Sequence, residues 1–236
     1  MKTPKLELRL LGVPQVLSRG RVIKLTRKST ALLAYLALEG ATPRETLAEL
    51  LWGGAGSPNP GANLRRELHR LRETAVRDHL ETPGAGLGLR AFTTDTEDAA
   101  RPGELLQGLQ LEDAVDFEAW REGQNGRRQR ARLEILRGAA AALEATDHRA
   151  ASAAWGQIVE LEPLSDADVQ SLLRCLLAAG ERDEAERAFL AFRERLARLS
   201  LTPGLETARL LLTSQHNPVG HARLLERVGR GGGFAV

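Results

Sequence analysis

The stretch Asn59-Pro-Gly-Ala-Asn-Leu-Arg-Arg-Glu-Leu-His-Arg-Leu-Arg-Glu-Thr-Ala-Val-Arg-Asp78 decides how the first part of this chain folds. Apolar residues recur in it at the spacing that stacks them on one side of an α-helix; they are Leu64, Leu68, Leu71 and Ala75. The other side of the same helical wheel carries Arg66, His69, Arg70 and Arg77. The pattern predicts a helix that packs on a core with one face and presents basic groups on the other.

Such a helix suits the DNA major groove, because a duplex is anionic and its base edges are rich in hydrogen-bond acceptors. A solvated amphipathic helix has the same pattern. The sequence on either side of the helix therefore has to decide between the two interpretations.

The sequence before this helix predicts a small sheet and a first helix. Leu6, Leu8 and Leu10 alternate with charged residues, and the turn Ser18–Arg21 leads into a second apolar run, as in an antiparallel hairpin. Thr26 is placed to cap a helix from Arg27 to Glu39, which Gly40 would end.

A second helix is predicted after Gly40. Thr42-Pro43-Arg44-Glu45 matches a capping box, with a threonine N-cap, a proline at N1 and a glutamate at N3. The helix would direct Leu47, Leu50, Leu51 and Trp52 inward. Residues 53–58 then break it, and Asn59 and Pro60 would restart the chain as N-cap and N1 of the basic helix. This loop is too long for a simple helix-turn-helix.

Two short apolar segments flank the turn Pro83-Gly-Ala-Gly86 and predict a β-hairpin, or wing. The glycines also suggest a nucleotide-binding loop, but its third glycine and following helix are missing, so the hairpin is favoured. The sheet, the three helices, the long loop and the wing together predict a winged helix.

The motifs in residues 5–90 resemble the OmpR-type winged helix of the Streptomyces antibiotic regulatory protein family. The motifs that carry the resemblance are Leu8–Gly12, Arg27-Lys28 with Ala31–Leu38, Leu47–Trp52 and Asn63–Arg72. In the wing, Gly86-Leu-Gly-Leu89 replaces the Gly-Tyr-x-Leu pattern of the family. The resemblance implies double-stranded DNA as the partner.

The candidate DNA contacts come from the helix starts, the basic helix and the wing. They are Arg27, Lys28, Arg44, Asn63, Arg65, Arg66, His69, Arg70, Arg77 and Arg90. Arg27, Lys28 and Arg44 begin helices, where backbone N–H groups favour an anion, but simple solvation explains them equally well. Arg90 either reaches the minor groove or stays in solvent.

The second half of the chain repeats with a period of 34 residues. Residues of like kind recur in five pairs: Ala139 and Leu173, Ala142 and Leu176, Ala151 and Ala185, Trp155 and Phe189, Ile158 and Phe192. This period is typical of tetratricopeptide helix pairs. Because two repeats are fewer than such a stack needs, 117–143 and 206–212 should supply helices that cap it.

Residues 103–212 resemble the bacterial transcriptional activation domain. The motifs are Gly103–Leu106, Asp116–Trp120 and Leu199–Pro203. Two features depart from that family. The connection from Asp95 to Arg101 is short, and Gly123-Gln-Asn-Gly126 is expected to interrupt a helix.

The expected fold is mainly α with a small antiparallel β component, a winged helix-turn-helix followed by a tetratricopeptide-like α-helical domain. The expected domains are 1–95 for DNA binding, 103–214 for activation, and an unpacked glycine-rich tail over 215–236. A fragment ending near Arg101 should then fold alone.

Charge separates the two halves of the chain. Residues 1–94 hold 15 Lys and Arg against 8 Asp and Glu, whereas residues 95–236 hold 18 against 23. A basic first half suggests a polyanion partner. The single cysteine, Cys175, excludes a disulfide framework, and the five histidines lie at unrelated spacings. We therefore expect no catalytic site, no metal and no cofactor.

No signal peptide opens the chain, and no apolar run approaches the roughly 20 residues that span a bilayer. We therefore expect a cytoplasmic protein without a membrane partner. By resemblance it would be a transcriptional activator that binds tandem direct repeats, as a dimer on DNA, and contacts RNA polymerase. The rival hypothesis is a tetratricopeptide-type scaffold without specific DNA binding.

Overall fold

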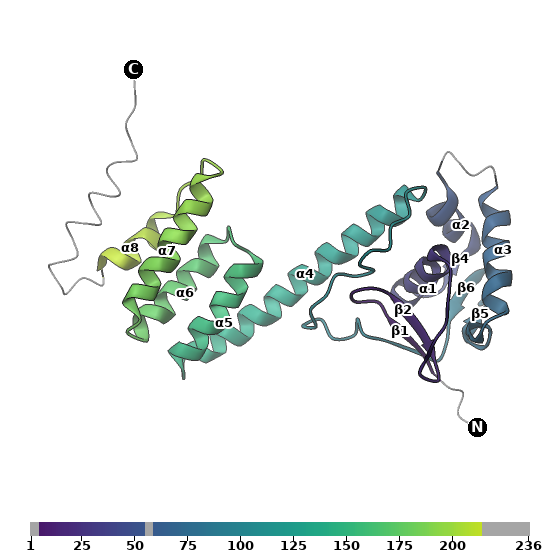
Figure 1. Ribbon diagram of the computed structural model, residues 1–236, viewed down its shortest axis with the longest axis horizontal. Helices are drawn as coiled ribbons and strands as arrows, with labels where there is room; N and C mark the ends of the chain where they lie inside the picture. Colours follow the sequence, from purple (N-terminus) through teal and green to yellow (C-terminus); the bar gives the residue numbers. More distant parts are fainter. Residues whose placement is uncertain (1–4, 55–58, 214–236) are drawn as a thin grey trace, which may run out of the picture. The chain divides into compact units, whose positions relative to one another are not determined.

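The computed structural model describes residues 5–54 and 59–213. Contacts divide the chain into two compact units, Met1–Arg132 and Leu133–Val236, which are drawn in Figure 1. Helix α4 (Val115–Glu144) passes from one unit into the other. The expected tail over 215–236 lies outside the described residues.

The first unit begins with the predicted antiparallel sheet. Strands β1 (Leu6–Arg9), β2 (Gln15–Ser18) and β3 (Arg21–Val22) lie side by side (Figure 1). Leu6 and Leu8 are fully buried, as alternation along a strand requires. Strand β7 (Phe92–Thr94) adds a parallel partner to β1, which the sequence did not predict.

Three helices follow the sheet at the predicted places: α1 (Arg27–Glu39), α2 (Arg44–Trp52) and α3 (Pro60–Arg72). The Thr26 hydroxyl accepts a hydrogen bond from the Ser29 N–H, and the Asn59 side chain accepts one from the Ala62 N–H. These bonds satisfy donors that have no partner within a helix. Both predicted caps are confirmed.

The predicted capping box is wrong. Thr42–Pro43 forms strand β4, which pairs with the wing strand β6 (Gly86–Leu89). The Thr42 hydroxyl donates to the Gly40 carbonyl at 3.1 Å, and the N-cap of α2 is Pro43, which makes no side-chain capping bond. The extended backbone required by the strand removes the threonine from the capping position.

The predicted wing is confirmed. Strands β5 (Leu80–Glu81) and β6 are antiparallel, and β4 extends them to a sheet in the order β4-β6-β5. Gly84 in the turn has φ +58°, a conformation that favours glycine. Helix α1 packs against β6.

Helix α3 ends at Arg72, before Ala75, which the sequence placed on its apolar face. The Thr74 hydroxyl donates to the Leu71 carbonyl at 2.7 Å and accepts from the Val76 N–H at 3.2 Å, which closes the helix. A 3₁₀ turn, η1 (Ala75–His79), follows. Ala75 is exposed and Val76 is buried instead.

The segment before α4 completes the core of the first unit. Its buried residues are Leu105, Leu106, Leu109, Leu111 and Ala114, and Phe117 in the first turn of α4 joins the same cluster. The compact units therefore divide at residues 132 and 133, and not between the expected domain ends at 95 and 103.

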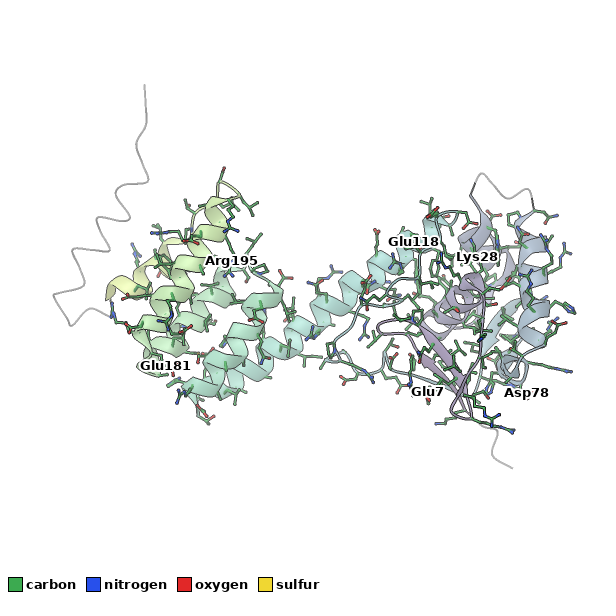
Figure 2. The ribbon with its side chains drawn as sticks, viewed as in Figure 1. Glu7, Lys28, Asp78, Glu118, Glu181 and Arg195 are labelled. Carbon is green, nitrogen blue, oxygen red and sulfur yellow. The ribbon has the colours of Figure 1, made fainter. Side chains whose placement is uncertain are left out.

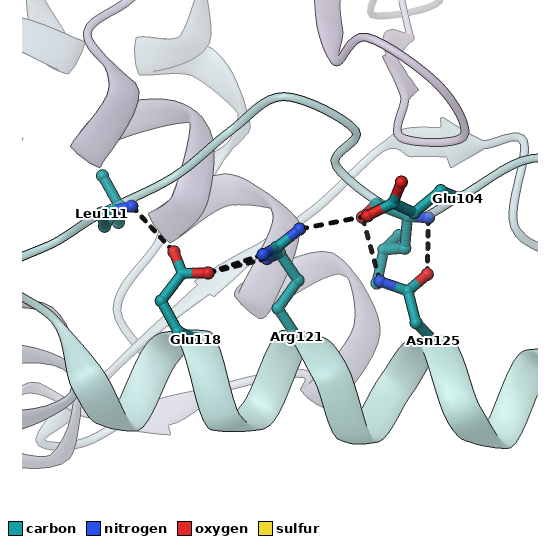
Figure 3. Close-up of polar contacts among 6 residues, drawn as sticks. Glu104, Leu111, Glu118, Arg121 and Asn125 are labelled. Carbon is teal, nitrogen blue, oxygen red and sulfur yellow. Dashed lines mark hydrogen bonds and ion pairs between the residues drawn. The ribbon is translucent and has the colours of Figure 1, made fainter.

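Polar contacts fix this segment to α4 (Figure 3). Asn125 accepts from the Leu105 N–H at 2.7 Å and donates to the Leu105 carbonyl at 3.3 Å. Glu118 accepts from the Leu111 N–H at 2.7 Å. The expected interruption at residues 123–126 is wrong, because α4 is continuous there and Asn125 faces a backbone partner.

Aromatic packing joins α4 to α1 within the first unit. The Trp120 ring lies 4.9 Å from the Tyr35 ring and 5.2 Å from the Phe117 ring, centroid to centroid. The Trp120 indole N–H donates to Glu39 at 2.7 Å. The first half of α4 is thereby part of the winged-helix unit.

The second unit contains α5 (His148–Leu161), α6 (Asp166–Ala178), α7 (Arg182–Ala197) and α8 (Leu205–Thr213), together with the end of α4. Helices α5 and α7 begin 34 residues apart, as do the ends of α4 and α6. Trp155 and Phe189 are buried at corresponding places on α5 and α7. The helical repeat is confirmed, with α4 and α8 as the flanking helices.

Two of the five repeat pairs do not match in environment. Ala139 and Ala142 are exposed on α4, whereas Leu173 and Leu176 are buried on α6. Helix α6 packs against α5, α7 and α8, so more of its circumference is covered. Helix α4 contributes different residues, including Ala140, to the core.

Cys175 is buried in the second unit, and burial raises the pKa of its thiol. Within the described ranges, every helix is too short or too polar to cross a lipid bilayer.

We predict that residues 1–132 fold as an isolated fragment, whereas residues 1–101 do not reach the same stability. The shorter fragment lacks six buried apolar residues, and each large one contributes about 1.5–3 kcal/mol on burial. Urea unfolding of both fragments measures the difference. Equal midpoints would contradict the packing described for Leu105 to Phe117.

We predict that Trp155→Ala lowers the free energy of unfolding by about 3–5 kcal/mol, because it leaves a cavity and frees Glu144, which accepts the indole N–H at 2.7 Å. Trp155→Phe is the control, since it keeps most of the packing and loses only the hydrogen bond. The variants are compared by thermal and urea unfolding, and an equal loss for both would place the effect in the hydrogen bond.

Candidate nucleic-acid interface

Helix α3 has a buried side and a basic exposed side. Leu64, Leu68 and Leu71 are at most 3 % exposed. Arg65, Arg66, His69, Arg70 and Arg72 are all exposed, and the side chains of His69 and Arg70 are 77 % and 61 % accessible. The helix therefore presents its basic groups to solvent while its apolar stripe fixes it to α1 and α2.

Glu67 anchors α3 to the start of α1. Its side chain is only 5 % exposed. One carboxylate oxygen accepts from the Ser29 hydroxyl at 2.5 Å and also from the Thr26 hydroxyl. The other oxygen accepts from the Arg70 guanidinium at 3.0 Å. A buried carboxylate is stable only with such partners, so the N-terminus of α1 and the basic face of α3 are held together.

Several exposed side chains of α3 are oriented by neighbours on the same helix. The Asn63 amide oxygen accepts from Arg66, and Glu73 lies 3.4 Å from the His69 ring nitrogen. These contacts are solvent-exposed, so they cost little to exchange for another acceptor. Arg65 and Arg72 make no ion pair within the described ranges.

The two basic residues at the start of α1 lie in different environments. Arg27 is exposed and follows Thr26, whose hydroxyl donates to Glu67 of α3. Lys28, labelled in Figure 2, is 16 % exposed. Its ammonium lies 2.8 Å from Asp113, donates to the Leu51 carbonyl and sits over the Trp52 ring. The structure therefore uses Lys28 to join α1 to α2 and to the segment before α4.

Arg44, Arg77 and Arg90 lie at the wing. Arg44 is the first residue of α2 and follows strand β4, which pairs with β6. Arg77 belongs to η1 and not to α3, so it does not share the predicted helix face. Arg90 follows β6 and donates from Nε to the Asp78 carbonyl at 3.2 Å. All three arginines are exposed.

Sequence reasoning missed Glu67 and Arg72. On a helical wheel Glu67 lies next to Leu64 and Leu71, and that position was the available signal that its carboxylate is buried. Its partners Thr26 and Ser29 are 41 and 38 residues away in the sequence, so no local pattern reveals them. Arg72 occupies the last turn of α3 and adds to the exposed basic face.

This arrangement provides planar bidentate donors and cations on one surface, which is what phosphate and base-edge acceptors require. Within the residues that the structure describes, no group of three acidic, histidine or cysteine side chains is arranged to hold a metal ion.

Comparison with known proteins adds a family and a fold. Residues 90–212 match the bacterial transcriptional activator domain family. The structure of Mycobacterium tuberculosis EmbR in complex with a low-affinity phosphopeptide is similar with a TM-score of 0.62 and 18 % identity, covering 97 % of this chain and 70 % of EmbR. At that identity the likeness shows a shared fold. No curated protein sequence matches the chain.

We predict that Glu67→Ala destabilises the first unit by about 1–3 kcal/mol, because the buried Ser29 hydroxyl is left without an acceptor. Glu67→Gln retains an acceptor oxygen for the two hydroxyls but turns an N–H group toward Arg70, so it should recover part of the loss. Urea unfolding of both variants checks the order. A Gln variant as unstable as the Ala variant would show that the bond to Arg70 carries the effect.

Proposed function

We propose that this chain, which belongs to the bacterial transcriptional activator domain family, is a regulator of the Streptomyces antibiotic regulatory protein type that activates transcription by binding specific DNA sequences. The basic face of α3 would lie in the major groove. The wing would contact the neighbouring minor groove, and the helical unit would contact RNA polymerase. Such a protein acts at the nucleoid, in the cytoplasm.

One observation carries the proposal: the basic residues of α3 are exposed on a helix whose other side is fixed in the core. Arg66, His69 and Arg70 point away from Leu64, Leu68 and Leu71 by their helical spacing and burial. A helix that is mounted rigidly and has its guanidinium groups in solvent can enter a groove without rearranging. The charge of residues 1–94 provides the long-range attraction.

The proposed phosphate contacts are the exposed arginines around this face, Arg27 at the start of α1 and Arg44, Arg77 and Arg90 near the wing. Lys28 is left out, because its ammonium already has Asp113 and the Leu51 carbonyl as partners. Asn63 and Arg65 extend the face of α3 on either side.

We also propose, from the family resemblance, that two copies bind direct repeats and contact each other as a dimer on the DNA.

The rival function is a peptide-binding scaffold, which the helical repeats of the second unit favour. A scaffold has no need for exposed arginines without acidic partners, and its partner binding would depend weakly on salt. Nucleic-acid binding weakens steeply as salt rises, because counterions are released from the duplex.

The first test selects duplexes from a random library with the full chain and measures their affinity as salt is varied. We expect one enriched sequence motif, present twice in the same orientation. We predict that Arg66→Ala and Arg70→Ala each cost about 1–3 kcal/mol on the selected duplex when the side chain reads a base, and relax the preference at one position. No enrichment, or binding independent of salt, would support the scaffold.

The matched control for these variants is the pair Arg149→Ala and Arg187→Ala in the second unit, where the side chains are 84 % and 67 % exposed. This pair removes the same charge but should leave the selected motif and its affinity unchanged. In vitro transcription with purified polymerase then tests activation. Full activation by residues 1–132 would move the polymerase contact to the first unit.

A further inference from the structure

A cleft of about 580 Å³ lies between the β2–β3 hairpin and η1, entirely within the first unit. We call it the hairpin cleft; its polar and charged lining consists of Ser18, Arg19, Arg21, Asp78 and His79. Neither the family resemblance nor the candidate interface accounts for it.

The hairpin turn holds its arginines in fixed places. Ser18 is paired with Arg21 across the strands, so Arg19 and Gly20 form a two-residue turn. Both have positive φ, +51° and +75°, as in a type I′ turn. Asn, Asp and Gly are the residues that suit the first position of such a turn. An arginine there is strained, and strained residues cluster at functional sites.

The charged side chains that line the hairpin cleft form no ion pairs within the described part of the chain. Arg19 and Arg21 are exposed and form no ion pair or side-chain hydrogen bond within the described part of the chain. Asp78 is the acidic residue of the lining, and it also lacks an ion pair there; its carbonyl accepts from Arg90. The His79 ring nitrogen Nδ1 is 3.2 Å from the Arg90 carbonyl. The cleft therefore has two available cations beside one carboxylate.

The position of the cleft indicates the partner. Turn η1 joins the end of α3 to the wing strand β5, so the cleft begins where the basic face of α3 ends. Asp78 is labelled on this turn in Figure 2. A duplex carries a phosphate at every nucleotide on both strands. If it lay along α3 and the wing, the phosphates beyond the bases read by α3 would pass the end of this helix, where η1 and the hairpin cleft lie.

We propose that the hairpin cleft binds a backbone phosphate of the DNA that flanks the bases read by α3. This inference rests on the proposed function and extends its interface to the N-terminal sheet. Arg19 and Arg21 would donate to the phosphate oxygens without contacting a base. They would add affinity and register without adding sequence preference.

The double variant Arg19→Asn with Arg21→Gln tests the proposal. Asn followed by Gly is the preferred sequence of a type I′ turn, so the hairpin should fold as well as before or better while both charges are lost. The control is Arg149→Gln with Arg187→Gln in the second unit. Each protein is measured on the duplex selected by the wild type, once with mixed-sequence flanks on both sides and once trimmed to the selected bases.

On the flanked duplex we expect the double variant to bind about tenfold more weakly, with a salt dependence lower by about two counterions, and with an unchanged sequence preference. On the trimmed duplex we expect the variant and the wild type to bind alike, because the flanking phosphates are gone. Hydroxyl-radical footprinting should show lost protection on one flank only.

Two outcomes overturn the inference alone: an unchanged affinity and salt dependence on the flanked duplex, or an equal loss on both duplexes. In both of these outcomes the wild type still selects a DNA motif, and that selection still requires Arg66 and Arg70. Failure of the proposed function looks different, because the wild type then selects no motif. The experiment thus distinguishes the two failures.

Discussion

The exposed basic face depends on one buried carboxylate. Removing a carboxylate from water costs several kcal/mol, and for Glu67 this cost is offset by hydroxyls from Thr26 and Ser29 and by the guanidinium of Arg70. The same atoms define where α3 lies relative to the start of α1. Thr26 and Ser29 belong to the start of α1, whereas Arg70 lies on α3 together with Glu67. Rotating α3 would therefore break both hydroxyl bonds to the buried carboxylate, so the direction of the arginines on α3 is fixed with Glu67.

Local patterns in the sequence were enough to predict the helices of the first unit and their caps at Thr26 and Asn59, because a capping side chain and the backbone N–H that donates to it lie three residues apart. The capping box at Thr42 failed for the opposite reason. That segment pairs with Leu87, 45 positions along the chain, and the long-range pairing overrides the local motif. Strand β7 was missed because three residues have no measurable periodicity.

The same distinction applies to the candidate site. Exposure of Arg66 and Arg70 follows from helical periodicity, so the sequence was sufficient to predict it. The role of Lys28 does not follow from helical periodicity, because its partner Asp113 lies far along the chain. Its place at the start of a helix suggested an anion contact, yet the ammonium is occupied by protein groups. A basic residue at a helix start is therefore a phosphate contact only when the fold leaves it unpaired.

Helix α4 shows why a family region and a folding unit need not coincide. The matched region begins at residue 90, but Leu105 to Phe117 fill the core of the first unit. Gly123 and Gly126 each cost the helix roughly 1 kcal/mol relative to alanine. Asn125, bonded to both backbone groups of Leu105, and Trp120, packed on Tyr35, offset that cost. The two glycines thus lie close in sequence to Trp120 and Asn125, which attach α4 to the first unit. The beginning of the matched family region is therefore part of the core of the first unit.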